Sequence, residues 1–139
     1  MRVFPDTNVL ASAFGTRGLC ADVIRLILGE HELVTGEVVI EELRRALSRK
    51  FGVPADTVQE IESLLRAYHV EPKPRHLPNL KLSERNDLLV VGSAIRAKAE
   101  IMITGDREIL GLKEKPRDLQ ILSPREFWTL VATKSRKRP

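Results

Sequence analysis

Short, mostly apolar runs alternate along the chain with segments in which apolar residues recur at helical spacing. Three such runs predict strands at 2–5, 100–104 and 119–122, and 33–35 and 68–71 are further strand candidates. The helical spacing predicts helices at 20–29, 37–51, 55–67, 84–99, 107–111 and 124–133. Strands without a polar side are typical of a parallel sheet that helices cover on both faces. The pattern therefore predicts an α/β fold with three layers, α/β/α, around a central, parallel, twisted sheet.

An aspartate follows two of the predicted strands. Asp6 follows the first apolar run, in the stretch VFPDTN, and Asp106 follows the run at 100–104, in IMITGD. Either acid could also serve in a turn or as a helix N-cap, which is a purely structural role. In an open parallel sheet, however, ligands bind beyond the carboxyl ends of the strands. Two acids at that edge therefore indicate a site.

A helical wheel places a third acid, Asp87, among apolar residues. At about 100° per residue, Asp87 shares an arc with Val91 and Ile95. Ser93 and Arg96 fall on the opposite face, which the wheel predicts to be exposed. The helix dipole favours an acid in the first turn by about 0.3 to 1 kcal/mol. That preference does not explain an acid on the inward face.

The wheel also separates two neighbouring glutamates in the helix predicted at 37–51. Glu41 falls on the outer face, whereas Glu42 borders the buried stripe that contains Val39 and Leu43. A glutamate at such a border is often an ordinary surface residue. From the wheel alone, Glu42 is equally consistent with a surface residue and with a site residue.

These acids come from separate segments, and together they indicate a metal site. Carboxylates brought together repel one another and raise one another's pKa values unless a divalent cation neutralises them. Oxygen ligands without a His or Cys cluster suit Mg²⁺ or Mn²⁺. A site of this kind can activate a water molecule and hold a phosphodiester.

The same residues resemble the PIN-domain family, the nuclease fold of the VapC-type toxins. The resemblance rests on DTN after the first strand, Glu42 in the first long helix, Asp87 seven residues before an alanine, and TGD after a later strand. It extends from residue 3 to about residue 128. Each motif is weak alone, but their common order is fairly specific.

The resemblance implies cleavage of RNA with Mg²⁺ or Mn²⁺ as the cofactor. Carried over by position, the catalytic and metal-binding acids are Asp6, Glu42, Asp87 and Asp106. The supporting polar residues are Asn8 and Thr104. The resemblance further implies a homodimer and, as a partner, a small antitoxin protein. The chain would then be the toxin component of a toxin–antitoxin pair.

The chain departs from the family pattern beside two of the acids. Many members have a further Asp next to the third acid and another two residues after the fourth. Here these neighbourhoods contain Glu84, Asn86 and Glu108. A second metal site is therefore an open question, and we interpret Glu108 as a surface helix residue.

Two other functions remain open on sequence grounds. One is a PIN-like module that binds RNA or protein without cleaving, although all four acids are present. The other is a phosphatase that forms an aspartyl-phosphate, but this chemistry generally uses a second Asp where the chain has Asn8.

Composition narrows the class of protein. The 139 residues are 42% hydrophobic and 30% charged, which is typical of a globular domain. Four of the 23 Lys and Arg residues lie in the last six positions, and the other 19 balance 19 Asp and Glu. We therefore predict a domain at 1–133 and a basic, disordered tail at 134–139 that either adds affinity for phosphates or only keeps the protein soluble. One cysteine, no signal sequence and no membrane-length apolar run predict a cytoplasmic protein without a membrane partner.

Overall fold

The computed structural model describes residues 1–136, and their side chains up to residue 132. Five parallel strands form one sheet in the order β3-β2-β1-β4-β5. The strands are β1 (Arg2–Pro5), β2 (Glu32–Gly36), β3 (His69–Glu71), β4 (Ile101–Ile103) and β5 (Gln120–Leu122). Each lies within one residue of its predicted bounds, and the predicted parallel sheet is confirmed.

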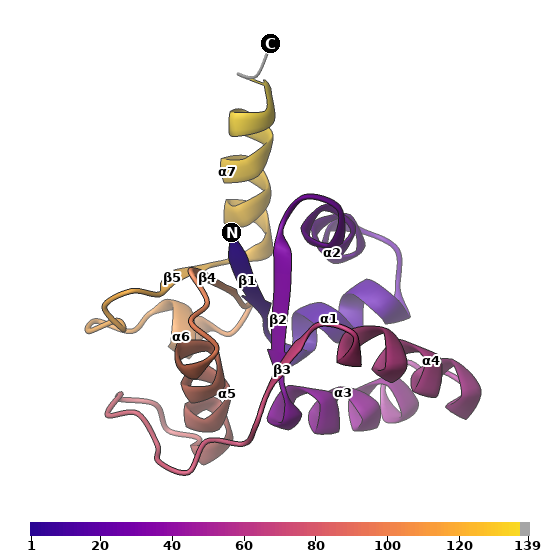
Figure 1. Cartoon of the computed structure of the whole chain (residues 1–139), viewed down its shortest axis with the longest axis horizontal. Helices are drawn as coiled ribbons and strands as arrows, with labels where there is room; N and C mark the ends of the chain where they lie inside the picture. Colours follow the sequence, from indigo (N-terminus) through magenta and orange to yellow (C-terminus); the bar gives the residue numbers. More distant parts are fainter. Residues whose placement is uncertain (137–139) are drawn as a thin grey trace.

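Helices surround the sheet, with α3 and α4 on one side of it and α5 and α6 on the other (Figure 1). The helices of the described region are α1 (Thr7–Gly15), α2 (Leu19–Glu30), α3 (Glu37–Arg49), α4 (Ala55–Arg66), α5 (Arg85–Arg96), α6 (Arg107–Leu110) and α7 (Pro124–Arg136). All but α1 were predicted. The helix predicted at 84–99 ends at Arg96 because Lys98 takes a left-handed backbone conformation, with φ of 56°.

The last helix begins where its sequence predicts. Ser123 and Glu126 form a capping box, in which Ser123 Oγ accepts from Glu126 N at 3.1 Å and Glu126 Oε1 accepts from Ser123 N at 2.9 Å. The helix continues to Arg136, so it extends three residues into the segment predicted as a disordered tail. Its end projects away from the rest of the molecule (Figure 1). Lys137 and Arg138 of the predicted tail lie outside the described residues.

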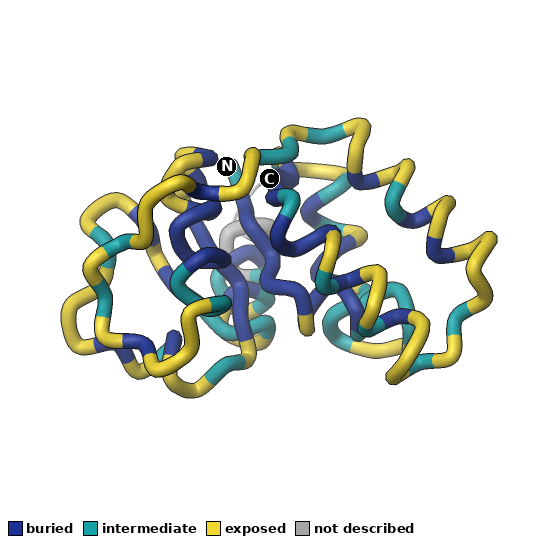
Figure 2. Tube along the Cα trace, turned by 90° about the horizontal axis from the view of Figure 1, so that it is seen from below, coloured by how far each residue is buried: buried dark blue, intermediate teal, exposed yellow. Residues whose placement is uncertain are grey.

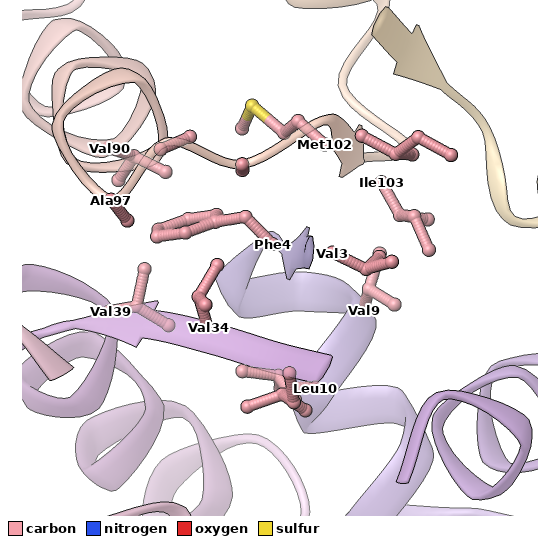
Figure 3. Packing of buried hydrophobic residues seen from close by; sticks show 14 of the residues in the cluster. Val3, Phe4, Val9, Leu10, Val34, Val39, Val90, Ala97, Met102 and Ile103 are labelled. Atoms are coloured by element: carbon pink, nitrogen blue, oxygen red, sulfur yellow. The ribbon is translucent and has the colours of Figure 1, made fainter. Parts of the chain in front are cut away.

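The hydrophobic core forms on both faces of the sheet and extends from β1 to α7. Phe4 of the central strand is fully buried, and Figure 3 shows it between Val90 and Ala97 on one side and Val34 and Val39 on the other. Burying an aromatic side chain of this size contributes several kcal/mol to stability. Buried residues lie in the middle of the molecule and exposed residues on its outer loops and helix faces (Figure 2). No helix in residues 1–136 is long and apolar enough to cross a membrane.

Candidate active site

The strand order places two of the predicted acids side by side. β1 and β4 are neighbours, although 95 residues of chain lie between them, and the connections leave them in opposite directions across the sheet. Such a switch in strand order opens a crevice at the carboxyl ends of the strands. The backbone N–H of Asp6 donates to Ile103 O at 2.8 Å, which fixes the two strand ends together. Asp6 and Asp106 therefore meet at one point of the sheet edge.

Asp6 is both a helix cap and a buried acid. Its Oδ1 accepts from the backbone N–H of Thr7 at 2.7 Å at the start of α1, and its Oδ2 accepts from Thr104 Oγ1 at 2.7 Å. Its residue is only 8% exposed. Burial raises the pKa of Asp6, and the charges of Glu42 and Asp106 raise it further, while the two hydrogen bonds oppose them. The fold therefore holds Asp6 in a buried environment that disfavours its charge, despite the two hydrogen bonds to its carboxylate.

Thr104 connects the two acids. Its fully buried hydroxyl donates to Asp6 and accepts from the backbone N–H of Asp106 at 3.0 Å. Asp106 in turn caps α6, where its Oδ1 accepts from Glu108 N at 2.9 Å and from Ile109 N at 3.1 Å. Both bonds end on Oδ1, so Oδ2 takes no part in the cap. Thr104 therefore hydrogen-bonds both the Asp6 carboxylate and the backbone of Asp106.

Glu42 reaches the same place from α3. Its Oε1 accepts from Thr7 Oγ1 at 3.2 Å, and its residue is partly buried, whereas Glu41 is exposed. The wheel therefore separated the two glutamates correctly. Thr7 was not predicted as a site residue, and the signal for it was its place directly after Asp6 in a motif of hydrogen-bonding side chains.

Asp87 lies in the first turn of α5 and is partly buried. Burial raises its pKa to about 6, with further contributions from Asp106, Asp6, Glu84 and Glu108, in that order. These interactions show that the third acid lies within electrostatic reach of the acids at the strand ends. We call these four acids from separate segments of the chain the acid site: Asp6, Glu42, Asp87 and Asp106.

The wheel was wrong about two other residues of α5. Ser93, predicted on the exposed face, is fully buried, and Ile95, predicted to be buried, is 39% exposed. The reason is that α5 packs against β2: a Cβ at Gly36 would lie 3.1 Å from Ser93 Cβ. Ser93 satisfies its hydroxyl by donating to Leu89 O at 2.9 Å.

The remaining candidates are exposed residues. Asn8, predicted as a supporting residue, is exposed in the first turn of α1, and Glu84 is exposed at the start of α5. Glu108 is an exposed residue of α6, in agreement with its interpretation as a surface residue. It also accepts hydrogen bonds from Ser83, one from the backbone N–H and one from Oγ at 2.8 Å, and these bonds lower the pKa of Glu108. This Glu108–Ser83 clamp joins α6 to the segment that leads into α5, a role that the sequence did not predict.

The four acids fit a hard divalent cation by their chemistry. They supply only carboxylate oxygens, and no ion pair in the described part of the chain includes any of them. Within residues 1–136, no three His, Cys, Asp or Glu side chains are grouped closely enough to hold a metal ion as they stand. Binding an ion would therefore require the carboxylates to move closer together.

Comparisons with known proteins agree with this architecture. A family model described as the PIN domain matches residues 2–108. The crystal structure of VapBC2 from Rickettsia felis, bound to a DNA fragment from their promoter, has a similar fold with a TM-score of 0.64. The similarity covers 88% of this chain and 98% of the matched chain at 15% sequence identity. No curated protein matches the chain in sequence.

Proposed function

This chain belongs to the PIN-domain family, and from that premise we propose that it is a metal-dependent endoribonuclease that hydrolyses RNA phosphodiesters. The acids that we assign to catalysis and to binding Mg²⁺ or Mn²⁺ are Asp6, Glu42, Asp87 and Asp106. Thr104 and Asn8 are the proposed supporting residues.

One observation carries the proposal: acids lie at the switch in strand order, and none of them has a basic ion-pair partner among the described residues. An uncompensated carboxylate in a partly buried position costs several kcal/mol. The raised pKa values of Asp6 and Asp87 express that cost. A divalent cation would remove it, because its charge favours the ionised carboxylates.

In this proposal the residues of the acid site and their neighbours have different roles. Thr104 and Thr7 fix the orientation of the Asp6 carboxylate, and the cap at α6 leaves Oδ2 of Asp106 for a ligand. Glu42 and Asp87 complete the acid site from α3 and α5. When bound, a divalent ion neutralises charge on a phosphodiester and assists the attack of water on phosphorus.

We also propose protein partners for this chain, by analogy with a similar structure. The similar structure contains VapBC2 with promoter DNA. By analogy, we propose that this chain is the toxin of a toxin–antitoxin pair, that it forms a homodimer, and that a small antitoxin protein binds it. Co-expression with the product of a short neighbouring reading frame tests the antitoxin, because a cognate partner should co-purify and suppress cleavage.

The decisive experiment is cleavage of labelled RNA by the purified chain with Mg²⁺ or Mn²⁺ and with EDTA. We expect cleavage only with the metal, and a loss of about 100-fold or more for Asp6→Asn. Glu42→Gln should also lose activity, and Glu41→Gln is its matched control, because it removes the same charge one residue away on the exposed face. Wild-type cleavage by Asp6→Asn would refute the assignment.

A further inference from the structure

A basic pocket lies beyond the end of β3, outside the acid site. Its volume is about 390 Å³. Its lining comes from the end of β3, the segment after it and the last turn of α5. The lining residues are Glu71, Pro72, Lys73, Arg75, His76 and Arg96. The proposed reaction uses none of these residues.

The strand register places this pocket at the same sheet edge as the acids. β3 pairs with β2 in parallel, with Glu71 opposite Gly36, and β2 pairs with β1 in parallel, with Leu33 opposite Val3. Continuing that register brings Gly36 level with Asp6. Two strand spacings, or about 10 Å, then separate the end of β3 from the end of β1.

The pocket carries more positive than negative charge. Its single carboxylate, Glu71, is already engaged, with Oε2 at 2.7 Å from His69 Nε2 and Oε1 at 3.8 Å from Arg96 Nε. Lys73 and Arg75 are exposed, and neither takes part in an ion pair within the described residues. Two cations therefore stay available for an anion from solution.

The loop that carries these cations rests directly on α5. Pro74, between the two cationic residues, is buried. A Cβ at Gly92 of α5 would lie 3.5 Å from Pro74 Cγ and 3.2 Å from Pro78 Cδ, so the glycine permits this close approach. Prolines also restrict the backbone of the loop. Because the loop is held in place, its cations lose less conformational entropy when they bind a ligand.

We propose that this pocket binds backbone phosphates of the RNA strand that the acid site cleaves. The inference rests on the proposed function and adds a substrate-binding surface to it. The acid site alone repels a polyanion, and cations beside the end of β3, a strand end about 10 Å from that of β1, offset that repulsion. A strand that spans both would place one phosphodiester at the acids and others over Lys73 and Arg75.

The test measures RNA binding separately from cleavage. Binding of a fluorescein-labelled oligouridylate is followed by anisotropy in EDTA over a range of salt concentrations. The pocket variant carries Lys73→Gln with Arg75→Gln. The matched control carries Arg49→Gln with Lys50→Gln, an exposed Arg and Lys at the far end of α3. Both variants remove the same net charge, and thermal unfolding checks that both keep the fold.

We expect the pocket variant to bind roughly tenfold more weakly than the control at moderate salt. The slope of log K against log salt should fall by about 0.7 for each RNA phosphate that the protein no longer neutralises, or about 1.4 in total. Equal affinities and slopes for the pocket variant and the control would overturn the proposal, as would failure of the wild-type chain to bind the RNA.

Cleavage kinetics add an independent readout. Phosphates held away from the reacting bond contribute equally to ground-state and transition-state binding, so the pocket variant should raise KM and leave kcat unchanged. A lower kcat with unchanged KM would contradict the proposal. If the wild-type chain binds RNA but does not cleave it, the proposed function fails, and the salt slopes still decide the role of the pocket.

Discussion

Replacing Asp87 by Asn should change how the stability of the metal-free protein depends on pH. The pKa of Asp87 is raised to about 6 by burial and by the neighbouring carboxylates. A raised pKa means that the folded chain binds the proton of Asp87 more tightly than the unfolded chain does. Between the ordinary value of 3.8 and about 6, folding therefore takes up protons, and stability falls as the pH rises. Above that window the loss is complete and constant.

The size of the effect follows from the shift. A change from 3.8 to about 6 corresponds to roughly 3 kcal/mol at 1.36 kcal/mol per pKa unit. Asp87 is only partly buried, so solvent screens much of this interaction and the expected cost is about 1 kcal/mol. Asn has nearly the same shape and no charge, so the variant should not show this loss.

The assay is urea unfolding of the wild type and Asp87→Asn in EDTA at pH 4.5 and at pH 7.5. Because pH 4.5 already lies above 3.8, about a third of the cost is present there, and we expect the wild type to lose roughly 0.7 kcal/mol more than the variant between the two pH values. Comparing the change with pH removes contributions that do not titrate. Adding Mg²⁺ at pH 7.5 should then stabilise the wild type more than the variant, because the ion binds the folded carboxylates.

If the free energy of unfolding changes equally with pH in the wild type and in Asp87→Asn, the prediction is wrong. Such a result would mean that Asp87 is as well solvated in the folded chain as in the unfolded one. Asp56→Asn is a suitable control, because this acid also lies in the first turn of a helix, α4, but is exposed. The control should follow the wild type at both pH values.

Three further substitutions test the site and the core. Thr104→Val removes the hydroxyl that joins Asp6 to Asp106 and should cost about 1.5 to 3 kcal/mol at neutral pH, whereas Thr104→Ser should keep most of that stability; urea unfolding measures both. Phe4→Ala leaves a cavity at the centre of the core and should cost about 3 to 5 kcal/mol in the same assay, and a loss under about 1 kcal/mol would contradict the packing described. Glu108→Gln should cleave RNA at the wild-type rate, because the side-chain oxygen of Gln can still accept a hydrogen bond from Ser83. A loss of cleavage as large as that of Asp106→Asn would instead identify Glu108 as a metal ligand.

The sheet could be predicted from the sequence because its central strands, β1 and β4, are short apolar runs, although the edge strand β3 (HVE) is mostly polar. The helix α1 could not, because its first turn, Thr7 and Asn8, is polar and its buried residues Val9, Leu10 and Ala11 are consecutive rather than spaced as one stripe. The sequence placed Asp6 at the end of the strand but could not show whether it is a helix cap, a site residue or both. In the structure its carboxylate caps this helix and also accepts from Thr104.

Side-chain partners were harder to predict than elements. The wheel assumes one buried stripe, whereas α5 is buried by β2 at Ser93 and by the proline-containing loop at Gly92, so a larger part of its circumference is covered. The Glu108–Ser83 clamp joins residues 25 positions apart and has no local pattern. Strand ends and helix faces follow periodic rules, and these rules singled out Asp6, Asp87 and Asp106, whereas Glu42 was assigned only through the family resemblance. Periodic rules contain no information on such long-range hydrogen bonds.

The hydrogen bond between Thr104 and Asp6 spans 98 positions of the chain, and this separation has a consequence for synthesis. β1 leaves the ribosome first, but its place is the middle of the sheet, between β2 and β4. Until β4 has been made, one edge of β1 has no strand to pair with and is open to aggregation or to chaperones. Asp6 also lacks both Thr104 and Asp106 during that time. A nascent chain therefore cannot assemble the acid site until β4, Thr104 and Asp106 have been made, about 100 residues after Asp6.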